Sequence, residues 1–149
     1  MSYQEEAKQA RIKVLEIIYK AQTSHIGSNF SCIDIMTVLF DKIDLSKDKF
    51  ILSKGWAAAS LYYFLYKKNR ITLEELDSYC GVCSTCKGHK YIKEFTCGGC
   101  SGTGISRFIG LAEPIHEDIP FAGGSMGYGL PAAVGFALSK KLKGEDGKV

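Results

Sequence analysis

Five of the six cysteines lie between positions 80 and 100, and four of these form two Cys-x-x-Cys pairs. The first pair is Cys83 and Cys86, and the second pair is Cys97 and Cys100. Two such knuckles can turn four thiolates toward one ion and complete a tetrahedral four-sulfur site. Clustered cysteines without a preceding signal segment are typical of metal binding rather than of a disulfide framework. The spacing therefore predicts a structural Zn²⁺ site, and residues 80–104 are expected to be a small zinc-knuckle insertion.

Two further residues, Cys80 and His89, bear on this metal site, and the sixth cysteine does not. Cys80 adds a fifth thiol in Cys-x-x-Cys-x-x-Cys spacing, which leaves an iron–sulfur cluster or a redox-active dithiol pair as the alternative to zinc. His89 lies between the two pairs and could compete as a ligand, although four thiolates already satisfy zinc. Cys32 stands alone among apolar residues, and we expect it to be a small buried hydrophobic residue.

A glycine-rich turn is the second feature with chemical potential. Four glycines lie between positions 123 and 129, directly before a strongly apolar segment that has the composition of a helix. Free backbone N–H groups at the start of a helix attract anions, and glycine allows the backbone to approach a ligand closely. A diphosphate is the obvious ligand for such a turn. Glycine-rich turns also occur where packing is merely tight, so this pattern alone leaves both interpretations open.

The elements that must position these residues are mostly helices. Three-four spacing of apolar residues predicts a helix over residues 3–22, with Ile12 and Leu15 widening its buried stripe. Capping boxes at Ser31 with Asp34 and at Thr72 with Glu75 predict two further helix starts. The other expected elements are a turn at residues 23–29, a buried strand at 49–53, helices at 56–66 and 127–142, and the start of a strand at 148–149. Helices around few strands indicate an α/β unit whose sheet is incomplete in this sequence.

Composition excludes several classes of protein. With 149 residues, of which 46% are hydrophobic and 23% charged, the sequence has the size and apolar content of one globular domain. The longest unbroken apolar run, at residues 132–138, is far shorter than the roughly 18 residues that a membrane span needs. The opening residues are polar and acidic, unlike a secretory signal. We therefore expect a cytoplasmic protein without a membrane partner.

Nucleic-acid binding is a further possibility that the charge pattern argues against. The residues that a zinc-knuckle nucleic-acid binder would use are Lys87, Lys90, Tyr91 and Lys93. Such a set is typical of a solvated surface, and a formal net charge of +3 is too small to indicate nucleic acid. We therefore expect no nucleic-acid partner.

Three motifs occur in an order that points to a known family. Residues 23–28 read Thr-Ser-His-Ile-Gly-Ser, residues 50–56 end in Ser-Lys-Gly-Trp, and residues 124–129 read Gly-Ser-Met-Gly-Tyr-Gly. They resemble the Ser-Gly-His-Pro-Gly, Ser-Lys-Gly-His and Gly-Ser-Leu-Gly-Gln-Gly motifs of the transketolases, which are thiamine diphosphate enzymes. The order and the rough spacing agree over residues 5–79 and 118–149.

The resemblance implies roles for particular residues. Gly124, Ser125, Met126 and Gly127 would lie along thiamine diphosphate, and His25 would face the substrate. A second family histidine corresponds either to His89, in the pair Gly88-His89, or to His116, and the sequence does not decide between them. Trp56 replaces the histidine that the family has after Ser-Lys-Gly, and indole cannot transfer a proton as imidazole can.

The resemblance also implies a fold and a function. We expect a partial thiamine diphosphate-binding fold, with helices packed on an incomplete parallel sheet, formed by residues 1–149 as the amino-terminal part of that domain. The implied activity is transfer of a two-carbon ketol unit between sugar phosphates by a fragment or subunit that is inactive alone. The Mg²⁺ ligands of the family lie beyond this sequence, so a carboxy-terminal section or subunit would supply them in a homo- or hetero-oligomer. The alternatives are a deoxyxylulose-phosphate synthase-like enzyme and a non-catalytic zinc-binding interaction module on a degenerate cofactor fold.

Overall fold

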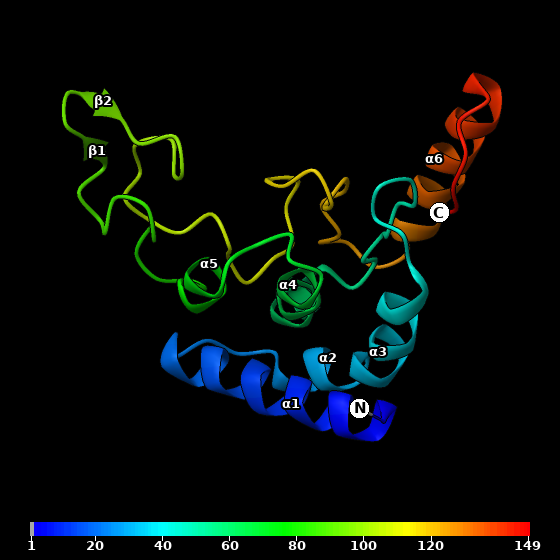
Figure 1. Ribbon diagram of the computed structural model, residues 1–149, viewed down its shortest axis with the longest axis horizontal. Coiled ribbons are helices and arrows are strands. Elements are labelled where there is room, and N and C mark those ends of the chain that lie inside the picture. The colour runs from blue at the N-terminus through cyan, green and yellow to red at the C-terminus, as the bar shows by residue number, and fades with distance from the viewer. Residues whose placement is uncertain (1) are drawn as a thin grey trace.

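The computed structural model describes residues 2–149, and its core is built from three helices (Figure 1). Helices α1 (Tyr3–Lys20) and α3 (Ile33–Lys42) contact each other, and both pack against α4 (Ala58–Lys67). The stripe predicted for the first helix is confirmed, and its buried members are Ala7, Ala10, Val14, Ile17 and Ile18. The prediction that Ile12 and Leu15 widen this stripe was wrong, because both lie on the outer face of α1, where no element covers them.

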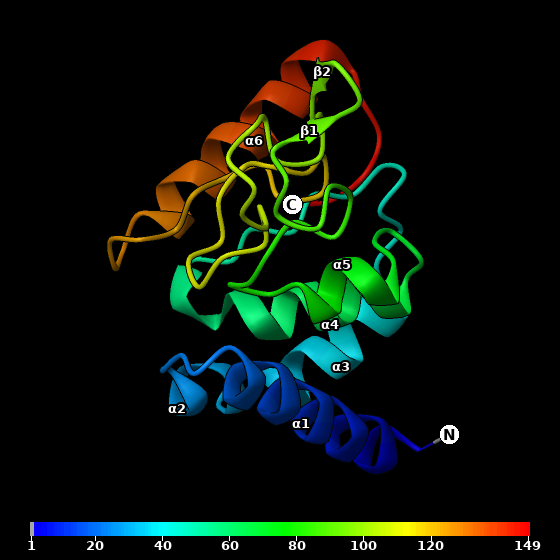
Figure 2. The ribbon, with the colours of Figure 1, turned by 90° about the vertical axis from the view of Figure 1, so that its left-hand side faces the viewer.

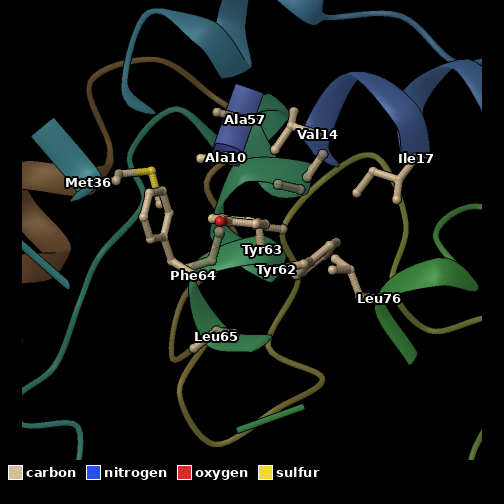
Figure 3. Close-up of a cluster of buried hydrophobic side chains, with 14 of the residues drawn as sticks. Ala10, Val14, Ile17, Met36, Ala57, Tyr62, Tyr63, Phe64, Leu65 and Leu76 are labelled. Atoms are coloured by element: carbon tan, nitrogen blue, oxygen red, sulfur yellow. The ribbon is translucent and has the colours of Figure 1, made fainter. Parts of the chain in front are cut away.

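Helix α4 lies at the centre of the molecule. Every residue from Ala58 to Leu65 is buried, as expected for a helix that is apolar on all sides. Figure 2 shows α4 between the layer of α1 to α3 and the coil that follows the hairpin, and Figure 3 shows Phe64 beside Met36 of α3. A 3-10 turn, η1 (Gly55–Ala57), leads directly into α4, so the helix predicted for residues 56–66 is confirmed with a tighter first turn.

The opposite face of α4 is covered by residues 106–119 and by α5 (Leu73–Asp77). The ring of Tyr62 meets the edge of Phe108 with centroids 5.2 Å apart, and its hydroxyl donates a hydrogen bond to the carbonyl oxygen of Ile109 at 3.0 Å. Burial raises the pKa of Tyr62 above its ordinary value. The capping box predicted at the start of α5 is confirmed, since the side chains of Thr72 and Glu75 each accept a hydrogen bond from the other's backbone N–H.

The capping box predicted at Ser31 with Asp34 was wrong. Helix α3 begins at Ile33, and no side-chain hydrogen bond caps it. The hydroxyl of Ser31 donates to the carbonyl oxygen of Ser28, and Asp34 forms an ion pair with Arg11 of α1. The predicted turn at residues 23–29 also contains the start of a short helix, α2 (Ile26–Phe30). The carboxylate of Asp34 therefore pairs with Arg11, a residue distant in the sequence, and does not cap α3.

The strand predicted at residues 49–53 is absent, and the parallel sheet is not confirmed. Within residues 2–149, the only sheet is the antiparallel hairpin of β1 (Tyr91–Ile92) and β2 (Phe95–Thr96). The N–H of Lys49 donates to the carbonyl oxygen of Lys148 at 2.9 Å. This contact brings the predicted strand start at residues 148–149 beside residue 49. One such hydrogen bond is too little to form a ladder, because a strand needs a neighbour along its length.

Residues 80–104 form a projecting segment that is tied at its base. Val82 pairs with Ile105 in an isolated antiparallel bridge, and the N–H of Ser106 donates to the carbonyl oxygen of Gly81 at 2.9 Å. Inside this segment the only buried cluster consists of the four cysteines of the two pairs, separate from the helical core. This stretch has no hydrophobic periodicity because its buried side chains are the four cysteines and not a row of apolar residues.

Helix α6 (Gly129–Lys143) projects at the end of the molecule opposite the hairpin (Figure 1). It ends at Gly144, which adopts a left-handed conformation with φ of 67°, as the sequence predicts. Although α6 is rich in apolar residues, Gly129 is its only buried residue. Among residues 2–149, no helix is both long and apolar enough to span a lipid bilayer.

Candidate functional site

The four paired cysteines converge on one point. Their Sγ atoms all lie within 4.8 Å of one another, and all four residues are buried. The Sγ atoms of Cys83 and Cys97 are 4.0 Å apart, and those of Cys86 and Cys100 are 3.6 Å apart. Four sulfur ligands about 2.3 Å from one ion lie about 3.8 Å apart in a regular tetrahedron. The measured separations therefore fit a single tetrahedral metal ion.

The surroundings of the thiols shift the pKa values of Cys100 and Cys97 in opposite directions. Although burial opposes ionisation, the N–H of Gly104, which donates to Sγ of Cys100 at 3.3 Å, and the neighbouring thiols lower the pKa of Cys100 to about 6. Burial raises the pKa of Cys97 to about 11. Gly104 has φ of +79°, a conformation that side chains rarely adopt, and this conformation carries its N–H next to Cys100.

The remaining candidate ligands lie outside this cluster. The thiol of Cys80 is half-buried next to Tyr79, and burial raises the pKa of Cys80. Cys32 is half-buried as well, and its thiol donates to the carbonyl oxygen of Asn29 at 3.1 Å. His89, which the sequence offers as a competing ligand, is exposed and is not part of the group of four sulfur atoms. Four sulfur atoms alone therefore make up the cluster.

His116 belongs to a partly buried polar network. Its Nε2 lies 3.1 Å from the carbonyl oxygen of Arg70, and its Nδ1 accepts a hydrogen bond from the N–H of Asp118. The Nε of Arg70 donates to Oδ2 of Asp118 at 2.6 Å, and this carboxylate is itself almost fully buried. Both ring nitrogens of His116 thus have partners within the fold, which fits a structural role.

The glycine turn packs directly against the Ser-Lys-Gly motif. The N–H of Gly55 donates to the carbonyl oxygen of Gly123 at 2.7 Å. A Cβ on Gly129 would lie 2.2 Å from Cβ of Ser53, and a Cβ on Gly123 would lie 2.3 Å from the carbonyl oxygen of Leu52. Only glycine allows so close an approach at these positions. Because Gly123 and Gly129 have no side chains, two of the three motifs can lie in direct contact.

The next residues of the turn present free backbone donors. Gly124, Ser125, Met126 and Gly127 are all exposed, and within residues 2–149 no hydrogen bond uses their N–H groups. Gly127 has φ of +90°, and a Cβ there would meet nothing within 4 Å, so the space in front of the turn is open. Successive free N–H groups ahead of a helix can bind an anionic group such as a diphosphate.

The third motif is attached to the other two through Trp56. His25 precedes α2, and its imidazole ring stacks on the indole of Trp56 with centroids 4.6 Å apart and an interplanar angle of 13°. The side-chain amide of Asn29 donates to the carbonyl oxygens of both residues. Asn29 has no motif in the sequence that marks it, and yet this polar residue is completely buried in the fold.

The close approach at Gly129 makes a prediction about the turn. Gly129→Ala is expected to force the glycine turn away from Ser53, because its new Cβ would overlap that side chain. The N–H of Gly55 would then lose its partner, and hydrogen exchange at this amide should become faster. Gly135→Ala is the matched control, since a Cβ there meets nothing within 4 Å and alanine favours a helix by up to about 1 kcal/mol over glycine. Equal exchange in both variants would contradict the contact.

Comparison with known proteins gives consistent results. A family model described as the transketolase, thiamine diphosphate binding domain matches residues 2–119, a range that contains His25 and the four paired cysteines and ends before Gly123. A protein from Phocaeicola vulgatus, named as a subunit of apulose-4-phosphate transketolase, is 27% identical over 152 residues, which cover 96% of this chain and 46% of that protein.

Two further relatives extend this comparison. A protein from Actinobacillus succinogenes, named as the same transketolase subunit, is 27% identical over 162 residues, which cover 100% of this chain and 51% of the relative. The protein named ferredoxin fas2 from Rhodococcoides fascians is 29% identical over 130 residues, which cover 80% of this chain and 35% of the relative. The chain thus spans about half the length of the first two relatives.

Proposed function

Because the chain belongs to the family of transketolase thiamine diphosphate-binding domains, we propose that it forms one wall of the cofactor site of a transketolase. The observation that carries this proposal is the row of free N–H groups from Gly124 to Gly127, next to the Ser-Lys-Gly motif and linked through Trp56 to His25. Two relatives are named as one subunit of a transketolase. By analogy, a second chain or section completes the enzyme.

The exposed turn has the features that a diphosphate needs. Gly124, Ser125, Met126 and Gly127 would hold the cofactor, with their N–H groups donating to the diphosphate oxygens. When bound, thiamine diphosphate supplies the carbanion chemistry that transfer of a two-carbon unit requires. We expect the Mg²⁺ that accompanies the diphosphate to take its protein ligands from the completing chain or section.

His25 is the residue of this chain that would contact the substrate. It is exposed, and an imidazole can donate or accept a hydrogen bond to a substrate. The substrates would be sugar phosphates, since the named activity of two relatives is that of an apulose-4-phosphate transketolase. The same names favour a transketolase over a deoxyxylulose-phosphate synthase-like enzyme.

The cysteine cluster would hold a structural Zn²⁺. The two measured Sγ separations bracket the edge of a tetrahedron around one ion. An iron–sulfur cluster with several iron atoms needs its cysteine ligands farther apart than this, so the geometry favours a single ion over that alternative. All four positions are filled by protein, which is typical of structural rather than catalytic zinc. Residues 80–104 would therefore be an insertion, within the domain formed by residues 1–149, whose fold is held together by the metal ion.

Helix α6 offers the surface on which a completing chain would dock. Its exposed apolar stripe has a spacing of four residues and consists of Leu130, Val134, Leu138 and Leu142. This stripe starts where the glycine turn ends, so a chain that closes the cofactor site would also meet α6. Large exposed apolar patches on globular proteins mark interaction sites.

The cofactor site can be tested on the complex of this chain with its completing partner. The complex is expected to bind thiamine diphosphate in calorimetric titrations with Mg²⁺, and Gly127→Val should weaken binding at least ten-fold. At φ of +90°, a branched side chain strains the backbone that aligns the N–H groups. Gly135→Val is the matched control, because a Cβ at residue 135 meets nothing within 4 Å, and this variant should keep the parent affinity.

One observation favours the second candidate function, a non-catalytic zinc-binding interaction module. The hairpin carries three exposed large hydrophobic side chains, Tyr91, Ile92 and Phe95, which suit a protein contact. The same complex discriminates between the two functions. A complex that assembles through the chain but shows no heat of binding with thiamine diphosphate would support the interaction module and contradict the transketolase proposal.

A further inference from the structure

We infer that Asn29 and Trp56 are positioning residues, which together hold the imidazole of His25 in one orientation and leave its Nε2 for a ligand. This inference rests on the proposed function, because it assigns the residues that prepare His25 for contact with substrate. Asn29 has no role in that proposal, and Trp56 enters it only as the link to His25. Trp56 stands where the transketolases have a histidine after Ser-Lys-Gly. The evidence lies in the contacts on each side of the His25 ring.

The backbone of His25 is held in an unusual conformation. Its φ of 73° is in the left-handed region, which a residue with a side chain adopts only where its surroundings enforce it. The carbonyl oxygen of His25 accepts two hydrogen bonds from Asn29, one from the backbone N–H at 3.1 Å and one from Nδ2 at 3.0 Å. Asn29 therefore supplies the contacts that enforce the conformation.

Asn29 also ties this segment to the Ser-Lys-Gly motif and to α4. Its Nδ2 donates a second hydrogen bond to the carbonyl oxygen of Trp56 at 3.3 Å, and its Oδ1 accepts one from the N–H of Ser60 at 2.8 Å. Both amide hydrogens thus meet carbonyl oxygens and the amide oxygen meets an N–H, so the partners themselves determine the orientation of the side chain. A fully buried amide with all these partners can hold His25 and Trp56 at a constant separation.

Trp56 and Ser24 restrain the imidazole ring itself. The near-parallel indole covers one face of the ring, and the hydroxyl of Ser24 lies 2.7 Å from Nδ1. An exposed side chain normally samples several rotamers, and these contacts remove that freedom in advance. Indole has no acceptor atom and does not titrate, so it holds the ring without competing for its proton. Nε2 and the second face of the ring are the parts left for a ligand.

The stack of His25 on Trp56 has a spectroscopic signature. An indole lying flat on an imidazole displaces the imidazole proton resonances upfield through its ring current. In the full chain labelled at histidine, we expect one of the three histidines to show this displacement, and His25→Gln should remove that signal. Trp56→Leu should abolish the displacement, and Trp56→Phe should restore part of it. Tyr19→Leu, which removes an exposed aromatic ring from α1, is the matched control and should change nothing.

A second set of variants tests Asn29. Asn29→Asp keeps the acceptor for Ser60 and loses both donors, so the upfield displacement should fall toward the value of a free histidine. Ser60→Ala removes only the hydroxyl that donates to the carbonyl oxygen of Asn29 at 3.2 Å, and it should produce a smaller decrease. This milder variant decides the question if Asn29→Asp fails to fold.

The outcomes separate this inference from the proposed function. A parent chain without an upfield histidine signal, or a signal that persists in Trp56→Leu, overturns the positioning role whatever the complex does with thiamine diphosphate. In the complex, Trp56→Leu should lower kcat with little change in KM, and Trp56→Phe should recover much of kcat. A stack that is present while the complex ignores the cofactor leaves the geometry intact and refutes only the proposed function.

Discussion

Cys97→Ser is expected to abolish metal binding and to unfold residues 80–104. The thiol of Cys97 is completely buried in the cysteine cluster, and the segment has no other buried hydrophobic cluster. Structural zinc sites contribute about 10–16 kcal/mol of binding free energy in small peptides at neutral pH, which is far more than such a short segment gains from apolar contacts. Elemental analysis should find one zinc per parent chain and less than about a tenth of that in the variant, since the loss of one ligand from four removes most of this energy.

The matched controls for this experiment are the two cysteines outside the cluster. Cys80→Ser and Cys32→Ser should each retain one zinc per chain, because neither thiol belongs to the buried group of four. The helical circular dichroism of Cys97→Ser should remain close to that of the parent, since the helical core is separate from the sulfur cluster. Iron with acid-labile sulfide in the parent, or full zinc content in Cys97→Ser, would refute the assignment of a single ion on four thiolates.

The double variant Val134→Asp, Leu138→Asp is expected to abolish assembly with a completing chain. Both side chains lie in the exposed stripe of α6. Burying a valine or leucine side chain is worth about 1.5–3 kcal/mol, and a carboxylate buried without a partner adds a penalty. Two such changes should weaken association by more than about a thousand-fold. Sedimentation velocity of the mixed chains measures this loss directly.

The control uses the same chemistry on the opposite side of the molecule. Ile12→Asp with Leu15→Asp places two carboxylates on the exposed outer face of α1, far from α6 (Figure 1). Because these side chains are exposed in the fold, both double variants should change the free energy of unfolding by only a few tenths of a kcal/mol per site. Undiminished assembly of the α6 variant, or loss of assembly in the α1 variant, would place the contact elsewhere.

The parts of the fold that the sequence predicts well depend on local pattern. The apolar spacing of α1 and the apolar run of α4 identify both helices, and Thr72 with Glu75 identifies the start of α5. The cysteine cluster is equally local, because each Cys-x-x-Cys pair brings its own two thiols together. The glycine turn and the stop of α6 at Gly144 belong to this group as well.

The parts that the sequence does not predict depend on distant partners. Asp34 matches a capping box as well as Glu75 does, yet its carboxylate pairs with Arg11 of α1. Residues 49–53 have the composition of a strand, but a strand also requires a neighbour with which to pair. Asn29 carries no local signal, because two of its three side-chain partners, the carbonyl oxygen of Trp56 and the N–H of Ser60, lie 27 and 31 residues further along the chain. A bound cofactor is also a distant partner, so the positions of His25 and of residues 124–127 relative to thiamine diphosphate stay predictions.

The tied base of the cysteine segment has an evolutionary consequence. The backbone leaves the helical body at Gly81 and returns to the same spot at Ser106, where the two stretches of chain are hydrogen-bonded side by side. Loss or gain of the intervening residues 82–105 would therefore leave Gly81 and Ser106 beside each other. Because all four paired cysteines lie inside this stretch, its gain or loss as one unit would carry the whole sulfur cluster with it and leave the separate helical core in place.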